Sequence, residues 1–196
     1  VIAATAGTVL ETHPAIAGVN GRTLGRGEMI EFKNTGDFVL TASEPVLLGQ
    51  FMVGSSYGIG GATCDRGFPP IIPESGCAIP ATCESGSAVG DPAYLLAVPT
   101  RQFRQDYILL TPQGYAENYV SLVFPESATV TIDGAPLASV PAPSLTFNGS
   151  GWSVVKQVLA EGVHHIESTR PLGVYAYGYD CDVSYAYPGG LNLSGR

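Results

Sequence analysis

Residues 164–179 read HHIESTRPLGVYAYGY, and their hydrophobic pattern changes at Pro171. Residues 164–168 alternate between polar and apolar side chains, which is the period of a strand with one buried face. Residues 172–179 are apolar or aromatic at nearly every position, which is typical of a strand covered on both faces. We therefore predict two strands within a packed sheet, joined by a corner at the proline.

A similar order of residues occurs near the start of the chain, around Pro45. Matched glycines and prolines at the same spacing indicate that a segment was duplicated. The first copy contains Gly36, Leu40, Ser43, Pro45, Val46, Leu48 and Phe51, which correspond in order to Gly162, Ile166, Thr169, Pro171, Leu172, Val174 and Tyr177. We expect repeat halves at about residues 8–53 and 121–179, within a single domain of residues 1–196.

Each half also carries a short turn motif. Residues 19–24 read VNGRTL, and residues 132–137 read IDGAPL. Asn-Gly and Asp-Gly pairs favour two-residue type I′ hairpins, because both central residues need a positive φ. No convincing amphipathic helix of ten or more residues is evident. The sequence thus predicts an all-β sandwich in which strands of two related halves pair around one shared core.

Composition and charge narrow the range of functions. The chain has 196 residues, of which 45% are hydrophobic and 13% charged, with 25 glycines and 15 prolines. Such a chain is too apolar to be disordered, and it suits short strands joined by tight turns. The formal net charge of −8 argues against a nucleic-acid partner. No apolar run approaches the roughly 20 residues of a transmembrane helix.

Four cysteines stand at Cys64, Cys77, Cys83 and Cys181, and their spacing matches no common zinc motif. Two disulfides in an oxidising compartment are favoured over buried free thiols. Three of the cysteines lie in residues 54–90, a long irregular loop rich in glycine and proline, which disulfides would stabilise. We predict bridges from Cys64 to Cys77 and from Cys83 to Cys181, while the other two connectivities stay open.

Five tyrosines lie between residues 174 and 190. The repeat equates Tyr177 and Tyr179 with apolar residues of the first half, so we interpret these two as packing residues. Tyr185 and Tyr187 have no counterpart there and precede a Pro-Gly-Gly turn. Aromatic pairs beside acidic residues often contact sugars or protein loops, so Tyr185, Tyr187 and Asp182 are the candidate ligand-binding residues.

Acidic residues flank Cys181 and suggest a metal site. Alternating oxygen ligands in a loop can hold Ca²⁺, which takes six to eight oxygens. Asp180, Asp182 and Asp91 are the candidate ligands, and calcium is the one cofactor considered. The alternative is that these carboxylates are solvated caps of a turn, as is usual for acidic residues in turns.

Catalytic motifs are weak. Residues 54–58, GSSYG, match the nucleophile elbow of hydrolases around Ser56, but the residues that follow do not begin a helix, as the elbow requires. His164 and His165 are adjacent, so on a strand they point to opposite faces, one packed and one solvated. We therefore predict no catalytic residue and no enzyme.

Several phrases of the sequence resemble the N-terminal domain family named for the IgG Fc-binding protein of mucus, which also has secreted bacterial members. They are GDP at 90–92, QFRQDYILLTP at 102–112, NYV at 118–120, HIESTRPLGVYAYGY at 165–179 and SYAYPGGL at 184–191. The similarity extends from Phe38 onward and is strongest after Gly90. This resemblance implies an extracellular β-rich recognition or adhesion domain.

We thus expect a secreted or cell-surface binding module that recognises an extracellular protein or glycan without catalysis. The alternative is a calcium-assisted carbohydrate-binding accessory domain.

Overall fold

The computed structural model describes residues 1–52, 91–137, 145–147, 149–180 and 183–193. Within these ranges nearly all regular structure is β, and the one helical element is a 3-10 turn, η1 (Thr100–Gln102). No helix of the described ranges is long and apolar enough to cross a membrane. The all-β prediction is therefore confirmed.

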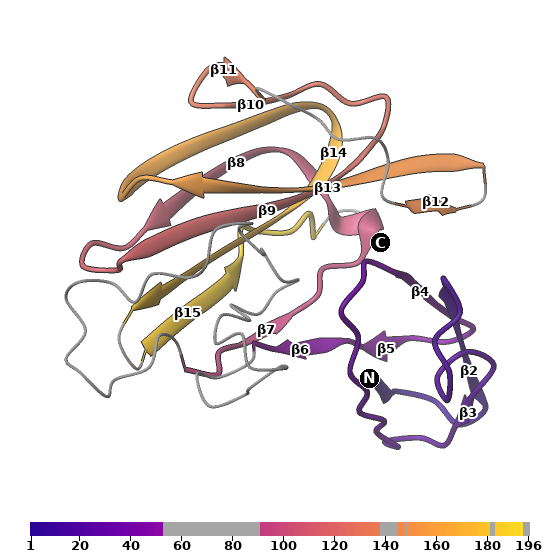
Figure 1. The fold of residues 1–196 in the computed structure, drawn as a ribbon. Coiled ribbons are helices and arrows are strands. Elements are labelled where there is room, and N and C mark those ends of the chain that lie inside the picture. Colours follow the sequence, from indigo (N-terminus) through magenta and orange to yellow (C-terminus); the bar gives the residue numbers. More distant parts are fainter. Residues whose placement is uncertain (53–90, 138–144, 148, 181–182, 194–196) are drawn as a thin grey trace.

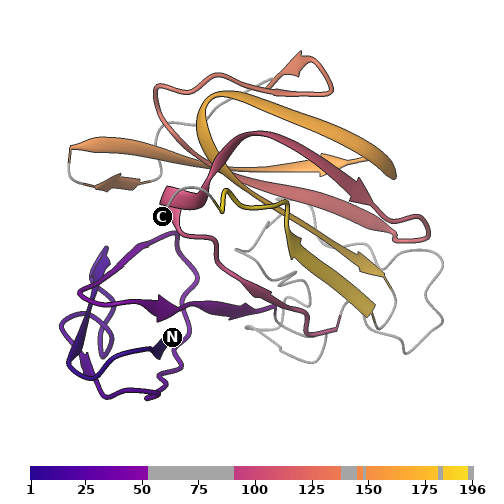
Figure 2. The same cartoon turned by 180° about the vertical axis from the view of Figure 1, so that it is seen from behind.

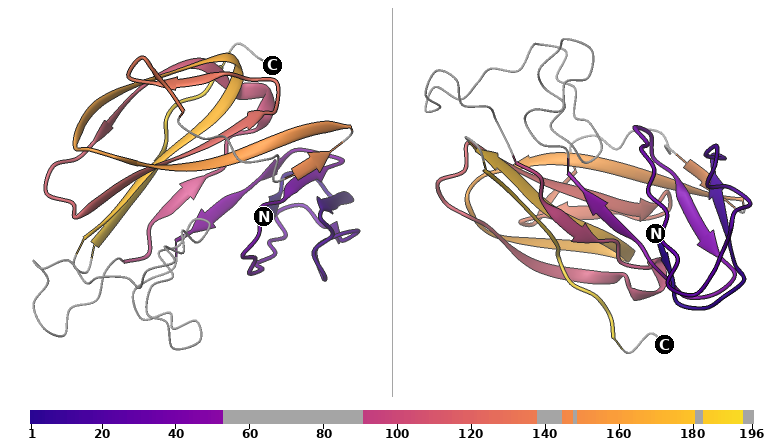
Figure 3. Two further views of the ribbon diagram at one scale, coloured as in Figure 1. Left: turned by 45° about the horizontal axis from the view of Figure 1, so that its top comes forward. Right: turned by 90° about the horizontal axis from the view of Figure 1, so that it is seen from below.

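β14 (Gly162–Asp180) is a long strand that belongs to two sheets (Figure 1). The first sheet has the order β11-β10-β14-β8, and the second has the order β12-β13-β9-β14-β15. The other strands are β8 (Arg104–Thr111), β9 (Glu117–Pro125), β10 (Val130–Ile132), β11 (Ala135–Pro136), β12 (Leu145–Phe147), β13 (Ser150–Leu159) and β15 (Val183–Pro188). Figure 3 shows the two sheets curling over each other as the layers of a sandwich.

The change of sheet occurs near Pro171. Up to Leu172, β14 pairs with β8 and β10, and from Gly173 it pairs with β9. The register with β8 shifts between Glu167 and Leu172. Proline has no N–H to donate, so strands tolerate it at such irregular positions. The predicted break is therefore in the right place, but the strand continues through it instead of ending.

The main apolar core lies between the two sheets. Alternate residues of each strand point inward, so every strand of this core contributes on a period of two. The buried members are Tyr107, Leu109, Val120, Leu122, Phe124, Val130, Val155, Leu159, Ile166, Leu172, Val174 and Ala176. All of them belong to residues 107–176, so the core is built without the N-terminal part of the chain.

The outer face of the second sheet is covered as well. β7 (Tyr94–Leu96) and the residues after it place Leu95, Val98 and Phe103 against Tyr175. Tyr177 and Tyr179 are fully buried in a neighbouring cluster. Every residue of β14 from 172 to 179 is buried. This confirms the packing role predicted for Tyr177 and Tyr179 and explains why that stretch is apolar on both faces.

The N-terminal residues form small sheets of their own, which lie beside the sandwich (Figure 2). These sheets are β3-β2-β4, β1-β5 and β6-β7. Their strands are β1 (Ile2–Ala3), β2 (Thr8–His13), β3 (Thr23–Leu24), β4 (Val39–Ala42), β5 (Val46–Leu47) and β6 (Gly49–Phe51). Ala3, Leu10, Val19, Leu24 and Ile30 make a separate buried cluster.

The prediction that strands of both halves pair around one shared core is wrong for the described part of the chain. No strand of residues 8–52 pairs there with a strand of residues 121–179. The short N-terminal strands bury their apolar residues against one another, and β6 pairs with β7.

The two halves nevertheless share a local pattern. β2 pairs with β3 and β4, as β10 pairs with β11 and β14, and Leu10 faces Ala42 just as Val130 faces Ser168. One residue further on, the Ser43 hydroxyl accepts a hydrogen bond from the backbone of Val9, at 2.9 Å. The hydroxyl of Thr169, its predicted counterpart, accepts one from Thr129 at the same distance. These contacts support the duplication, which stays a prediction.

The two predicted hairpin turns differ. Asp133 and Gly134 both have positive φ, of 53° and 78°, so the predicted turn between β10 and β11 is confirmed. In the Asn20-Gly21 pair of the first half, Gly21 has a positive φ and Asn20 does not. The Arg22 amide instead donates to the Val19 carbonyl, and the turn lies inside a longer connection from β2 to β3. The type I′ prediction for Asn20-Gly21 is therefore wrong.

Candidate binding surface

Tyr185 and Tyr187 lie on β15, the edge strand beside the second half of β14. Their rings stack with centroids 6.0 Å apart, and the Tyr115 ring meets Tyr185 edge-on at 4.8 Å. All three tyrosines are half-buried. The predicted pair thus forms part of a row of three aromatic rings, named here the tyrosine row (Tyr115, Tyr185 and Tyr187).

Hydrogen bonds hold two members of the tyrosine row in place. The Tyr185 hydroxyl donates to Asn118 Oδ1 at 2.6 Å. The Tyr187 hydroxyl donates to the Leu110 carbonyl and accepts from the Leu110 amide at 3.1 Å. Burial raises the pKa of both phenols. Through these contacts Tyr185 and Tyr187 join β15 to neighbouring strands, which is a structural role. Their contact with a ligand stays a prediction.

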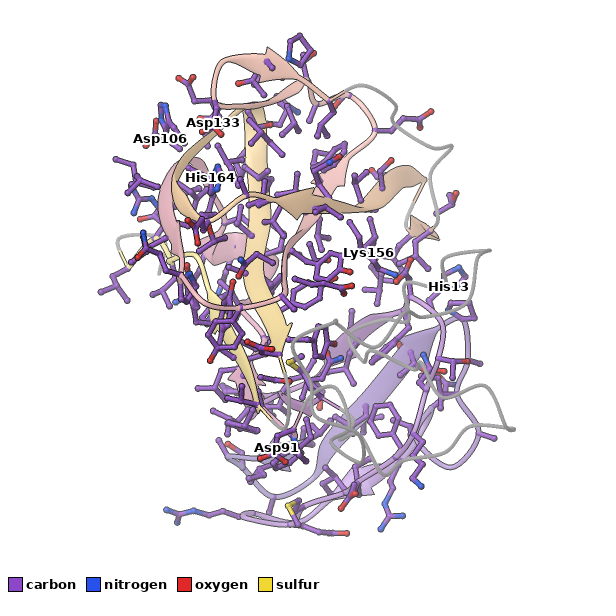
Figure 4. The ribbon with its side chains drawn as sticks, turned by 60° about the vertical axis from the view of Figure 1, so that its left-hand side comes forward. His13, Asp91, Asp106, Asp133, Lys156 and His164 are labelled. Atoms are coloured by element: carbon purple, nitrogen blue, oxygen red, sulfur yellow. The ribbon has the colours of Figure 1, made fainter. Side chains whose placement is uncertain are left out.

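The predicted calcium ligands are only partly placed. Asp182 lies outside the described residues. The Asp91 amide donates to the Ser184 hydroxyl at 3.0 Å, and Asp180 faces Val183 where β14 and β15 meet. Asp91 and Asp180 therefore lie at the same end of this strand pair. Figure 4 shows Asp91 far from Asp106 and Asp133. The site itself stays a prediction.

The four cysteines, and the predicted bridges between them, lie outside the described residues. Ser56 lies outside them too, so the structure says nothing of the nucleophile-elbow motif.

The two adjacent histidines point to opposite faces of β14, as predicted. His164 is buried, with Nδ1 at 2.8 Å from Asp133 Oδ2 and Nε2 at 2.9 Å from the Ala160 carbonyl. His165 is half-exposed, and its Nε2 lies 2.8 Å from Asp106 Oδ2. Sequence reasoning predicted the packed and solvated pair but not the carboxylates that contact it, because Asp106 lies on β8 and Asp133 in the turn after β10, both distant in sequence.

An exposed apolar patch lies on the ribbon of β6 and β7. Phe51 is 68% exposed, Tyr94 46% and Leu96 41%. Phe51 faces Tyr94 across the two strands, and their ring centroids are 4.8 Å apart. Because alternate residues share a face, Leu96 lies on the same side. These three residues are named the β6–β7 patch.

The opposite side of the ribbon is anchored in the protein. Leu95 is buried with Val98, Phe103 and Tyr175. The Tyr175 hydroxyl accepts a hydrogen bond from the Val98 amide at 3.0 Å. The β6–β7 patch is thus a firmly held apolar surface, which is the kind of surface that binds partners in many proteins.

Sequence reasoning missed the β6–β7 patch because it equated Phe51 with the buried Tyr177. Tyr177 lies in a central strand that is covered on both faces, whereas β6 pairs with β7 alone among the described strands. The one available signal was residues 93–98, AYLLAV, whose apolar side chains lie on both faces of a short strand. The pattern does not reveal whether a second layer covers the outer face.

Comparison with known proteins gives one finding. No curated protein and no solved structure matches the chain. A family model described as IgGFc binding protein matches residues 1–178. The match reaches the first residue, further than the resemblance from Phe38 onward, and it ends before the phrase at 184–191. Since it covers most of the sequence, the chain belongs to the IgGFc binding protein family.

Proposed function

We propose that this chain is a non-catalytic extracellular binding module for a protein ligand, and that the β6–β7 patch is its contact surface. Membership of the IgGFc binding protein family supports an extracellular, protein-binding role. The observation that carries the choice of surface is the exposure of Phe51, Tyr94 and Leu96 on one face of an anchored ribbon. Secretion or cell-surface display follows from the same role.

Aromatic residues suit such a contact. Phenylalanine and tyrosine bury large areas at a small cost in conformational entropy, and a few such residues carry most of the binding energy at protein interfaces. The chain's negative charge favours a ligand whose surface is neutral or basic around the contact. A protein ligand is favoured over a glycan because the Leu96 side chain is apolar. It adds contact area but cannot form hydrogen bonds with the hydroxyl groups of a sugar.

The test uses Phe51→Ser, with Val158→Ser as the matched control. Val158 is also an exposed apolar residue, 61% accessible, but it lies on β13. Surface plasmon resonance with IgG Fc, the ligand that the family description names, should show binding that Phe51→Ser weakens at least tenfold and Val158→Ser leaves unchanged. Fc binding that both variants retain would contradict the patch as the contact surface.

The carbohydrate-binding alternative with calcium is tested alongside. It is supported by the contact between Asp91 and Ser184, which brings one predicted ligand to the end of the β14–β15 pair. A glycan array read with and without a chelator separates the two proposals. Chelator-sensitive glycan binding that survives Phe51→Ser would replace the protein-binding proposal.

A further inference from the structure

We infer that Asp106, His165 and Glu167 form a binding site for a divalent transition-metal ion of the zinc class. Each of the three side chains offers one ligand atom, and these atoms all lie within 4.8 Å of one another. The site is separate from the β6–β7 patch and does not depend on the proposed function.

The strand geometry brings the three side chains to one face of the first sheet. His165 and Glu167 are two residues apart on β14, so they point the same way. Asp106 of β8 stands directly opposite Glu167 in the ladder, and Ile108 stands opposite His165. Two residues of β14 and one of β8 thus place three ligand groups close together on one face of the sheet.

Side chains must rotate before one ion can contact all three residues, because the two carboxylates approach different nitrogens of the His165 ring. Zinc bonds of about 2.0–2.2 Å in a tetrahedron place ligand atoms roughly 3.3–3.6 Å apart. His165 Nε2 and Asp106 Oδ2 are 2.8 Å apart, and His165 Nδ1 and Glu167 Oε2 are 3.8 Å apart. One ring nitrogen would bind the ion, and both carboxylates would turn toward it. All three side chains are about half exposed, so these rotations meet little resistance.

The backbone under the site is held on both sides. The His165 amide donates to Asp133 Oδ1 at 2.8 Å, and its carbonyl accepts from the Asp133 amide at 2.8 Å. His164 and Ile166, its neighbours in the chain, are buried on the other face. A preorganised backbone of this kind lowers the entropy lost when ligands converge on an ion.

The donor set selects the class of metal. Calcium prefers six to eight oxygens, whereas an imidazole with two carboxylates suits zinc and its neighbours in the first transition row. Two carboxylates and a neutral ring give a local charge of −2, which one divalent ion balances. Three protein ligands leave a coordination position open to water.

The competing state of the cluster is a simple ion pair. Asp106, the nearer carboxylate, raises the pKa of His165 most, and Glu167 and Asp133 add to this effect. A proton and a metal ion compete for the ring nitrogen, so the experiment must distinguish an ion pair from a metal site.

The test is isothermal titration of the whole chain with ZnCl₂, after its thiols have been alkylated so that no cysteine can bind the ion. We expect one Zn²⁺ per chain. His165→Ala should weaken binding by more than the 10–100-fold that loss of a supporting residue typically costs, and Asp106→Asn and Glu167→Gln by about tenfold or more. His13→Ala, a histidine of β2, is the control and should leave the affinity unchanged.

A second measurement reads the ring directly and does not depend on the stability of a variant. In ¹H–¹⁵N spectra of the imidazoles, Zn²⁺ should shift one ring nitrogen of His165 and leave His13 and His164 in place. Absence of binding at millimolar Zn²⁺, or an affinity that His165→Ala does not change, would overturn the inference.

Discussion

At the scale of single residues, the contact between Asp133 and His164 ties a turn to a buried side chain. Both ring nitrogens of His164 lie within hydrogen-bond distance of an oxygen, one from Asp133 and one from the Ala160 carbonyl. The bond from His164 is the largest cause that lowers the pKa of Asp133. Asparagine also tolerates the positive φ of this turn, so Asp133→Asn removes the charge without changing the turn.

We expect Asp133→Asn to lower the free energy of unfolding by about 1 kcal/mol at neutral pH, a small figure because the carboxylate is half exposed. A lowered pKa stabilises the fold above the ordinary pKa of the carboxyl and loses that effect as pH falls through the folded-state value. The difference from the wild type should therefore vanish in acid. Urea unfolding at several pH values measures it, with the exposed Glu126→Gln as the control. The stabilising role of the Asp133 carboxylate would be contradicted if the two proteins still differed in unfolding free energy below both the folded-state and the ordinary pKa of Asp133.

Single residues also show what the sequence could and could not reveal. Tyr177 and Tyr179 were predicted as packing residues because the repeat equates them with apolar residues of the first half, and both are buried. The exposure of Phe51 and the cluster around His165 were not, because both depend on neighbours contributed by other strands. A one-dimensional pattern tells which side chains share a face of a strand, but not what lies opposite that face.

At the scale of elements, β8 pairs with β14 on one side, and the Tyr187 hydroxyl bonds to the backbone of Leu110. The Tyr187 phenol thus satisfies backbone groups that a further strand would otherwise bind at the free edge of β8. It also links β8 to β15. Unpaired strand edges invite association with other chains, so this contact protects the edge locally.

We expect Tyr187→Phe to destabilise the protein by about 1–2 kcal/mol, because the amide and carbonyl of Leu110 lose their partner. Hydrogen–deuterium exchange at the Leu110 amide should accelerate. Tyr115→Phe is the matched control, since Tyr115 meets the tyrosine row through its ring. Unchanged exchange at Leu110 in Tyr187→Phe would show that the hydroxyl does not protect the edge.

The long strand β14 illustrates the limit of element prediction. Its position and the irregularity at Pro171 followed from the sequence, since proline cannot donate within a ladder. The sequence did not predict that the strand continues through Pro171. A proline at a register shift and a proline at a corner between two strands give the same sequence pattern. The membership of β14 in two sheets depends on partners as distant as β8.

At the scale of the whole molecule, Met52 links the N-terminal sheets to the sandwich. Its side chain is 2% exposed and packs with Tyr119, Tyr177 and Tyr179, and its amide donates to the Ala93 carbonyl at 2.8 Å. The predicted single domain of residues 1–196 depends on such contacts, because the two main apolar clusters are separate.

We expect Met52→Ala to lower the free energy of unfolding by about 2–5 kcal/mol, the usual cost of truncating a buried methionine. Met29→Ala is the control, because Met29 is 63% exposed and its loss should change stability by less than about 0.5 kcal/mol. Urea unfolding followed by the fluorescence of Trp152 gives both values. Equal effects of the two substitutions would mean that Met52 does not join the two parts.

The shared strand has a mechanical consequence. A sandwich whose layers touch only through side chains can slide apart when its ends are pulled. Here one continuous backbone runs through both layers, so tension that displaces either layer must also shear the ladders on both halves of β14. β14 should therefore be the last strand to separate from its neighbours when the protein is pulled.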